Sequence, residues 1–225
     1  IERAVPGETR VETVVREVPT VVTEEDLIVA AIKAGLAGTV RIAAAEKPNL
    51  GSGFLLTQAG VIATSDKVLG LSEGQGSSSA VEYTVFFWNG KSRKARLLHR
   101  IDSGVALLKL DLGNAVDISK VEELEDKELP ISALVLEEGE RRPGQTVLAL
   151  GLAGDGTPAI SRGLITALTP SSGAAPELIR TSAVIPATLG GPLLNLNGRV
   201  IGLNKEEGTA LGIKFLQEAL AAVAV

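Results

Sequence analysis

The sequence contains no cysteine and only one histidine. Without cysteine the chain can form neither disulfides nor thiolate metal sites, and the lone His99 cannot complete a zinc site. We therefore expect no metal and no other cofactor. Aromatic residues are also scarce, at 3% of 225 residues, so the core must be built from Val, Leu, Ile and Ala. No apolar run approaches the roughly 20 residues that are needed to span a bilayer.

The charge of the chain argues against a nucleic-acid-binding surface, because the formal net charge is −5. The densest group of basic residues falls between Lys91 and Arg100, where the charges alternate along a predicted strand. Such spacing is typical of one solvated face of a strand. The 25 glycines favour many tight turns and short strands over long helices.

The two ends of the chain differ from its middle. Residues 1–22 alternate charged and β-branched residues and are broken by prolines, which indicates a tether or arm. Thr23 then offers a helix N-cap followed by three acidic residues, and Gly35 is the expected end of that helix. The alanine-rich segment Gln217–Val225 predicts a short C-terminal helix.

Between these ends the sequence reads as short apolar runs separated by turn signals, of which Asn89-Gly90 and Asn197-Gly198 are the strongest. An acidic stretch at 113–129 predicts a linker between two halves. We expect two small antiparallel β-barrels, the first with its helix at 23–112 and the second with the C-terminal helix at 130–225. Ten strands are predicted, namely Gly53–Leu56, Val61–Thr64, Val81–Trp88, Lys91–Leu98, Val105–Leu110, Thr146–Leu150, Ala159–Leu168, Leu178–Thr181, Pro192–Leu196 and Val200–Asn204.

Seven segments between about Ala34 and Phe215 carry the motifs of one known family, in order and with compatible spacing. Together they resemble the trypsin-like serine protease domain of the HtrA (Deg) family, which implies two six-stranded barrels with the active site between them. One such motif would be weak evidence, whereas seven in order are strong. The segments are Gly51–Leu56, Gly60–Leu69, Ser103–Lys109, Thr146–Gly151, Ser161–Ala167, Thr188–Leu193 and Gly198–Asn204.

The resemblance also implies where a catalytic triad would stand. It puts Lys67 at the position of the general-base histidine, Gly104 at that of the aspartate and Leu189 at that of the nucleophilic serine. Leucine has no nucleophilic atom and glycine has no side chain to orient a base, so a serine–histidine mechanism has no residues to perform it. We expect Leu189 to pack inward, and Lys67 either to reach solvent or to pair with a nearby carboxylate such as Asp66 or Asp102.

The loop before Leu189 would form the family's oxyanion hole. The backbone N–H groups would come from Ala187 and Leu189, although Ala187 replaces a glycine whose freedom helps that loop to form. Thr188 carries a hydroxyl beside the vacated serine position. A rearranged site with Thr188 as nucleophile and Lys67 as base is therefore an alternative reading.

The sequence thus predicts a catalytically inactive protease homologue, a pseudoprotease, that binds a protein or an extended peptide or serves as a scaffold, as a monomer or a homo-oligomer. The alternatives are an active hydrolase with a rearranged site and a purely structural module of the cell envelope or surface. The family resemblance implies a place outside the cytoplasm, in the periplasm or cell envelope. Any membrane tether is expected in a segment upstream of Ile1, since the chain itself offers none.

Overall fold

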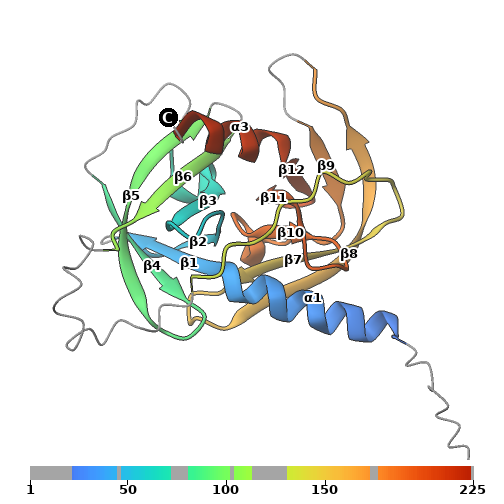
Figure 1. Ribbon diagram of the computed structural model, residues 1–225, viewed down its shortest axis with the longest axis horizontal. Helices are drawn as coiled ribbons and strands as arrows, with labels where there is room; N and C mark the ends of the chain where they lie inside the picture. Colours follow the sequence, from blue (N-terminus) through green and yellow to red (C-terminus); the bar gives the residue numbers. More distant parts are fainter. Residues whose placement is uncertain are drawn as a thin grey trace, which may run out of the picture.

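The computed structural model describes residues 22–44, 47–71, 81–101, 104–112, 131–172 and 177–223, with residues 47–50 described by their backbone alone. Within these residues, twelve strands form two closed antiparallel barrels of six strands each, with a helix at either end of the described chain. Figure 1 shows the barrels side by side, α1 along one side of them and α3 on the opposite side. The predicted fold is confirmed. The predicted arm, except for Val22, and the predicted linker lie outside the described residues.

Helix α1 (Glu24–Gly38) begins where the sequence predicts, but it continues past the expected stop. Thr23 and Asp26 form a capping box, in which each side chain accepts a hydrogen bond from the other residue's backbone N–H. Gly35 does not end the helix. A Cβ atom at Gly35 would lie 2.4 Å from the side chains of Leu150 and Leu194, so this glycine allows the helix to approach the second barrel closely. Gly35 is thus needed for close packing inside the helix. The sequence pattern alone does not distinguish such a glycine from one that ends a helix.

The first barrel closes in the strand order β1-β2-β3-β6-β5-β4. The turns predicted at Gly60 and at Asn89-Gly90 join β2 to β3 and β4 to β5, and both glycines have a positive φ. Each of the six strands pairs with a neighbour on both sides. The strands are β1 (Thr39–Ala44), β2 (Lys47–Leu55), β3 (Val61–Ser65), β4 (Glu82–Phe87), β5 (Ser92–Ile101) and β6 (Val105–Leu110).

The second barrel closes in the order β10-β11-β12-β9-β8-β7, and Asn197-Gly198 forms the predicted turn between β10 and β11. Ten of the twelve strands overlap those that the sequence predicts. The two that it missed are β1, which follows α1 without a turn, and the four-residue β12. The strands are β7 (Thr146–Leu152), β8 (Pro158–Thr169), β9 (Leu178–Thr181), β10 (Pro192–Leu194), β11 (Val200–Glu206) and β12 (Thr209–Gly212).

A third apolar cluster, outside the two barrel interiors, joins the barrels to both helices. It contains Ala31 of α1, Phe54 and Val105 of the first barrel, Leu148 of the second, and Leu216 of α3 (Lys214–Val223). Helix α3 contacts β5 and β6 as well as β12, so it lies against both barrels. This helix begins three residues before the predicted start. Among the described residues, no helix is long and apolar enough to cross a membrane.

Candidate functional site between the barrels

The three positions at which the sequence predicts a degenerate triad lie on segments that contact one another. Lys67 belongs to the short helix α2 (Asp66–Leu69), and the backbone N–H of Asp66 donates to the carbonyl of Gly104 at 3.1 Å. Leu189 follows the 3-10 helix η2 (Pro186–Thr188). A Cβ atom at Gly51 would lie 2.9 Å from Val68 and 3.2 Å from the carbonyl oxygen of Leu189, so α2 and Leu189 both lie close to the Gly51 backbone.

Lys67 lies at the surface of this site and is paired across the two barrels. Its side chain is 55% exposed, and its amine donates a hydrogen bond to the carboxylate of Glu206 at the end of β11. This hydrogen bond and the charge of Lys67 lower the pKa of Glu206, against a smaller opposing effect of burial. Lys67 thus reaches solvent and also pairs with a carboxylate, the two outcomes that the sequence predicts, but the carboxylate is that of Glu206 in the second barrel and not that of Asp66. Asp102 lies outside the described residues.

Asp66 is unavailable to Lys67 because it is committed to a buried ion pair. Its carboxylate accepts a hydrogen bond from Nη2 of Arg100 at 3.2 Å. The two side chains are only 10% and 6% exposed. Because each charge neutralises the other in a poorly solvated place, the pair fixes the start of α2 against β5.

The space beside Gly104, where an aspartate side chain would begin, is occupied. A Cβ atom there would lie 3.0 Å from Cε and 3.2 Å from Nζ of Lys205, and 3.4 Å from Oδ1 of Asp66. Gly104 also has a φ of +99°, a conformation that side-chain-bearing residues rarely adopt. A side chain at position 104 would therefore meet both backbone strain and a lysine.

Leu189 packs inward, as the sequence predicts for this apolar residue. It is partly buried and contacts both barrel interiors: the cluster that contains Val68 and Leu69, and the cluster that contains Val147 and Leu193. The side chain thus bridges the cores of the two barrels.

The loop that would form an oxyanion hole is folded onto itself. The N–H of Leu189 donates to the carbonyl of Pro186 at 3.3 Å, which directs this donor into the 3-10 turn. The side-chain amide of Asn204 donates to the carbonyls of Thr188 and Pro192 at 3.0 and 3.2 Å and holds the loop from the side of β11. Ala187 is exposed at the turn.

Thr188, the only hydroxyl in that turn, is also committed. Its side chain is fully buried, and its Oγ1 atom both donates to the carbonyl of Ile185 at 2.9 Å and accepts from the Ile185 N–H at 3.2 Å. These two bonds hold Thr188 to its own turn. Thr188 and Lys67 therefore lie in the same site, but the hydroxyl bonds to Ile185 and the amine bonds to Glu206.

Four residues of the site were not predicted from the sequence: Arg100, Asn204, Lys205 and Glu206. The run Asn204-Lys205-Glu206 at the end of an apolar strand is a visible polar signal, but nothing in the sequence identifies its partners. Those of Asn204 lie 16 and 12 residues away, and that of Glu206 lies 139 residues away. His99, the single histidine of the sequence, lies on β5 opposite Leu107. Within the described ranges, no three His, Cys, Asp or Glu side chains are grouped as metal ligands would be.

Comparison with known proteins agrees with this architecture. Residues 51–203 match the family model for the trypsin-like peptidase domain, which is more than half of the chain. The chain belongs to the trypsin-like peptidase domain family. The matched segment runs from Gly51 to Leu203 of β11, and so includes Lys67, Gly104 and Leu189.

Relatives of this trypsin-like domain carry HtrA or Deg names. A probable periplasmic serine endoprotease DegP-like of Halomonas elongata is 30% identical over 178 residues, which is 76% of this chain and 33% of the relative. Serine protease HTRA3 of Homo sapiens is 30% identical over 172 residues, covering 73% of this chain and 34% of that protein. The chain therefore spans about a third of the length of these relatives. The crystal structure of Deg5 shares the fold, with a TM-score of 0.70, 24% identity, and coverage of 89% of this chain and 95% of that one.

Proposed function

We propose that this trypsin-like domain is a pseudoprotease, which binds a protein or an extended peptide or serves as a scaffold without cleaving it. One observation carries the proposal: the side chain of Leu189, the residue that the motif match puts at the position of the nucleophilic serine, packs into the cores of both barrels. A leucine offers no atom that can attack a carbonyl carbon. An acyl-enzyme cannot form at this position.

The other parts of the site support the same proposal. The N–H of Leu189 is hydrogen-bonded to Pro186, while an oxyanion hole needs that donor aimed at the developing negative charge. Lys67 is held by Glu206 as a charged group, whereas a general base must be able to take up a proton. Neither residue is arranged for acyl transfer.

A rearranged hydrolase that uses Thr188 and Lys67 is disfavoured by the same geometry. Thr188 is buried and bonded twice to Ile185, and its hydroxyl proton is donated to a backbone carbonyl. Lys67 points to Glu206 at the surface. A nucleophile and its base must lie within hydrogen-bonding reach of each other, and these two groups are engaged elsewhere.

Binding without cleavage is consistent with the fold, because a protease-like domain can accept an extended chain by adding it as a strand. The periplasmic name of the Halomonas relative supports a place outside the cytoplasm, in the periplasm or cell envelope. We propose the same location for this chain, with membrane tethering, if present in the full protein, through an upstream segment. Assembly into homo-oligomers belongs to the same proposal.

A fluorophosphonate probe and a casein assay test the absence of catalysis. We expect neither covalent labelling nor cleavage above the buffer background, and the same result for Thr188→Ala. Turnover that disappears in Thr188→Ala, while the variant keeps its circular dichroism spectrum, would establish the rearranged hydrolase instead. A pull-down from the native source then separates the binding module, which retains a partner, from the purely structural module, which retains none.

A further inference from the structure

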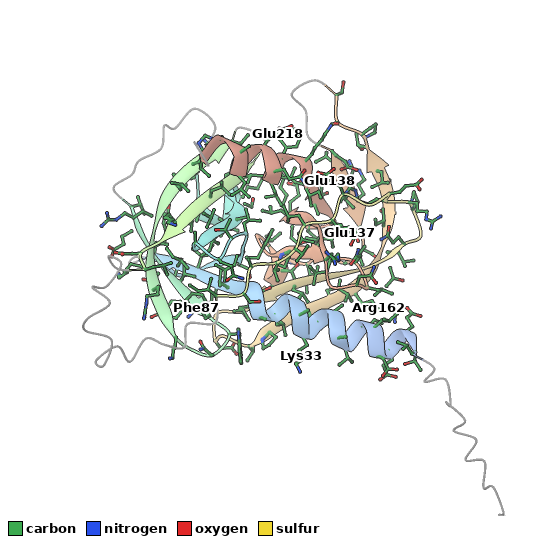
Figure 2. The ribbon with its side chains drawn as sticks, in the orientation of Figure 1. Lys33, Phe87, Glu137, Glu138, Arg162 and Glu218 are labelled. Carbon is green, nitrogen blue, oxygen red and sulfur yellow. The ribbon has the colours of Figure 1, made fainter. Side chains whose placement is uncertain are left out.

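A polar cavity of about 270 Å³ lies apart from the candidate site and shares no residue with it. Three segments meet there: the stretch before β7, the two ends of the β8–β9 connection, and the beginning of α3. Figure 2 shows Glu138, one of the lining residues, close to α3. The polar lining residues are Glu138, Arg141, Ser171, Glu177, Lys214 and Gln217.

Arg141 is the central group of this cavity. Its Nε and Nη2 atoms donate to the two carboxylate oxygens of Glu177 at 3.2 and 2.6 Å, a bidentate pair whose side chains are 14% and 18% exposed. The third guanidinium nitrogen, Nη1, is buried and finds no hydrogen-bond partner among the described residues. A buried charged donor without an acceptor is costly, so a group from outside the chain is expected to supply one.

The other polar groups of the cavity indicate the chemistry of the ligand that would bind Nη1 of Arg141. Three of the four carboxylate oxygens in the lining are engaged, because both oxygens of Glu177 bind Arg141 and Oε1 of Glu138 accepts from the side chain of Gln217. The two cationic groups of the lining still have N–H donors to offer, at Nη1 of Arg141 and at the amine of the exposed Lys214. We therefore expect the cavity to bind a ligand that has hydrogen-bond acceptor oxygens.

We propose that this cavity binds the carboxylate of a small ligand, with Nη1 of Arg141 and the amine of Lys214 as its donors. The negative charge of Glu138 on the same wall disfavours a doubly charged anion such as phosphate. The cavity lies just below the usual 300–1,000 Å³ of small-molecule sites, so the bound part is small. A free organic acid and the C-terminus of a peptide share this chemistry.

Isothermal titration and amide chemical shifts of the 15N-labelled chain test the proposal with matched probes. We expect saturable binding of N-acetylalanine with shifts at 141, 171 and 214, and at least tenfold weaker binding of the neutral N-acetylalaninamide. Acetate and a tripeptide with a free C-terminus, compared with its amidated form, distinguish the two sources. Binding of acetate indicates a free acid as the ligand, and binding of the peptide alone indicates a C-terminus; either result supports a carboxylate site.

Two variants assign the binding to the cavity. Arg141→Lys keeps a positive charge for Glu177 but removes Nη1, and Lys214→Gln removes the exposed amine; each is expected to weaken binding about tenfold. Lys33→Gln on α1, on the opposite side of the molecule in Figure 2, should leave binding unchanged. Two results would overturn the proposal: equal shifts with the acid and the amide, or no shifts with either probe at millimolar concentrations. Either result would mean that water alone fills the cavity. If Arg141→Lys does not fold, Lys214→Gln and the acid–amide pair decide the question.

Discussion

Lys67 of α2 and Glu206 of β11 form an ion pair that joins the first barrel to the second. The sequence predicts that Lys67 stands where active members of the family carry the histidine of their triad. Here the residue at that position makes a contact between the barrels. Both side chains are about half exposed, so solvent weakens the attraction between them.

Removing this ion pair is expected to change stability little. Lys67→Met and Glu206→Gln should each alter the free energy of unfolding by less than about 1 kcal/mol, because exposed pairs are screened by water and salt. Urea denaturation of both single variants and the double variant gives the coupling energy of the pair. A coupling of several kcal/mol would mean that the pair is shielded from solvent and carries much of the contact between the barrels.

The pKa of Glu206 reports directly on the same contact. Because the hydrogen bond from Lys67 lowers this pKa in the folded chain, the stabilisation it brings is present above the unfolded value of about 4.3 and is lost as the pH falls through the folded value. Lys67→Met should therefore raise the pKa of Glu206 toward its ordinary value, with Lys205 and Arg180 still lowering it in part. A carboxyl 13C titration by NMR measures the change. Lys33→Met on α1 is the control, and an unchanged Glu206 titration in Lys67→Met would show that the two groups do not interact in solution.

The buried pair of Arg100 and Asp66 should behave differently from an exposed pair of the same chemistry. Arg100→Met leaves Asp66 charged and buried without its partner, and we expect a loss of about 3–5 kcal/mol in the free energy of unfolding. Arg162→Met breaks a pair with Glu24 in which both side chains are more than half exposed, and it should cost less than about 1 kcal/mol. Guanidinium denaturation compares the two variants. Equal losses would contradict the buried position of Asp66.

Restoring the three catalytic residues is expected to yield no protease. The triple variant Lys67→His, Gly104→Asp, Leu189→Ser places an aspartate at a φ of +99°, where a side chain strains the backbone. The new aspartate would also lie beside the amine of Lys205, which would compete with the new histidine for the aspartate's carboxylate. Casein cleavage and fluorophosphonate labelling should both stay at background. Activity at a level typical of the family would show that the backbone at 104 and the loop before 189 rearrange readily.

The backbone part of that argument has its own control. Gly104→Ala and Gly90→Ala both place a side chain at a positive φ, but only at Gly104 do other atoms lie within 4 Å. Because Lys205 can move the end of its side chain aside, we expect similar losses of about 1–3 kcal/mol for the two variants. Thermal and urea unfolding measure both. A much larger loss at Gly104 would mean that Lys205 is held rigidly in the vacated space.

Local signals predicted most of the fold. The turns at Gly60, Asn89-Gly90 and Asn197-Gly198 occur where the sequence places them, because each depends on the conformation of two or three neighbouring residues. Helix α1 was predicted to stop at Gly35, because a glycine that allows close packing looks the same in sequence as one that ends a helix.

The family motifs predicted which residues lie at the site, but they did not predict which partners those residues contact. The motifs place Lys67, Gly104 and Leu189, and the apolar character of Leu189 is enough to predict that it packs inward. The partner of Lys67 could not be found in the same way. Glu206 lies 139 residues further along the chain, and only the closed barrels bring the two together.

The position of α3 has a consequence for the order in which the molecule can form during synthesis. This helix is at the end of the described chain, yet it covers β5 and β6 of the first barrel through the apolar cluster that contains Val105 and Leu216. A ribosome that has released only the first half of the chain leaves those strands without their cover. The first barrel thus reaches its final surroundings only after α3 has emerged, and until then the apolar surface that α3 covers on β5 and β6 stays exposed to water.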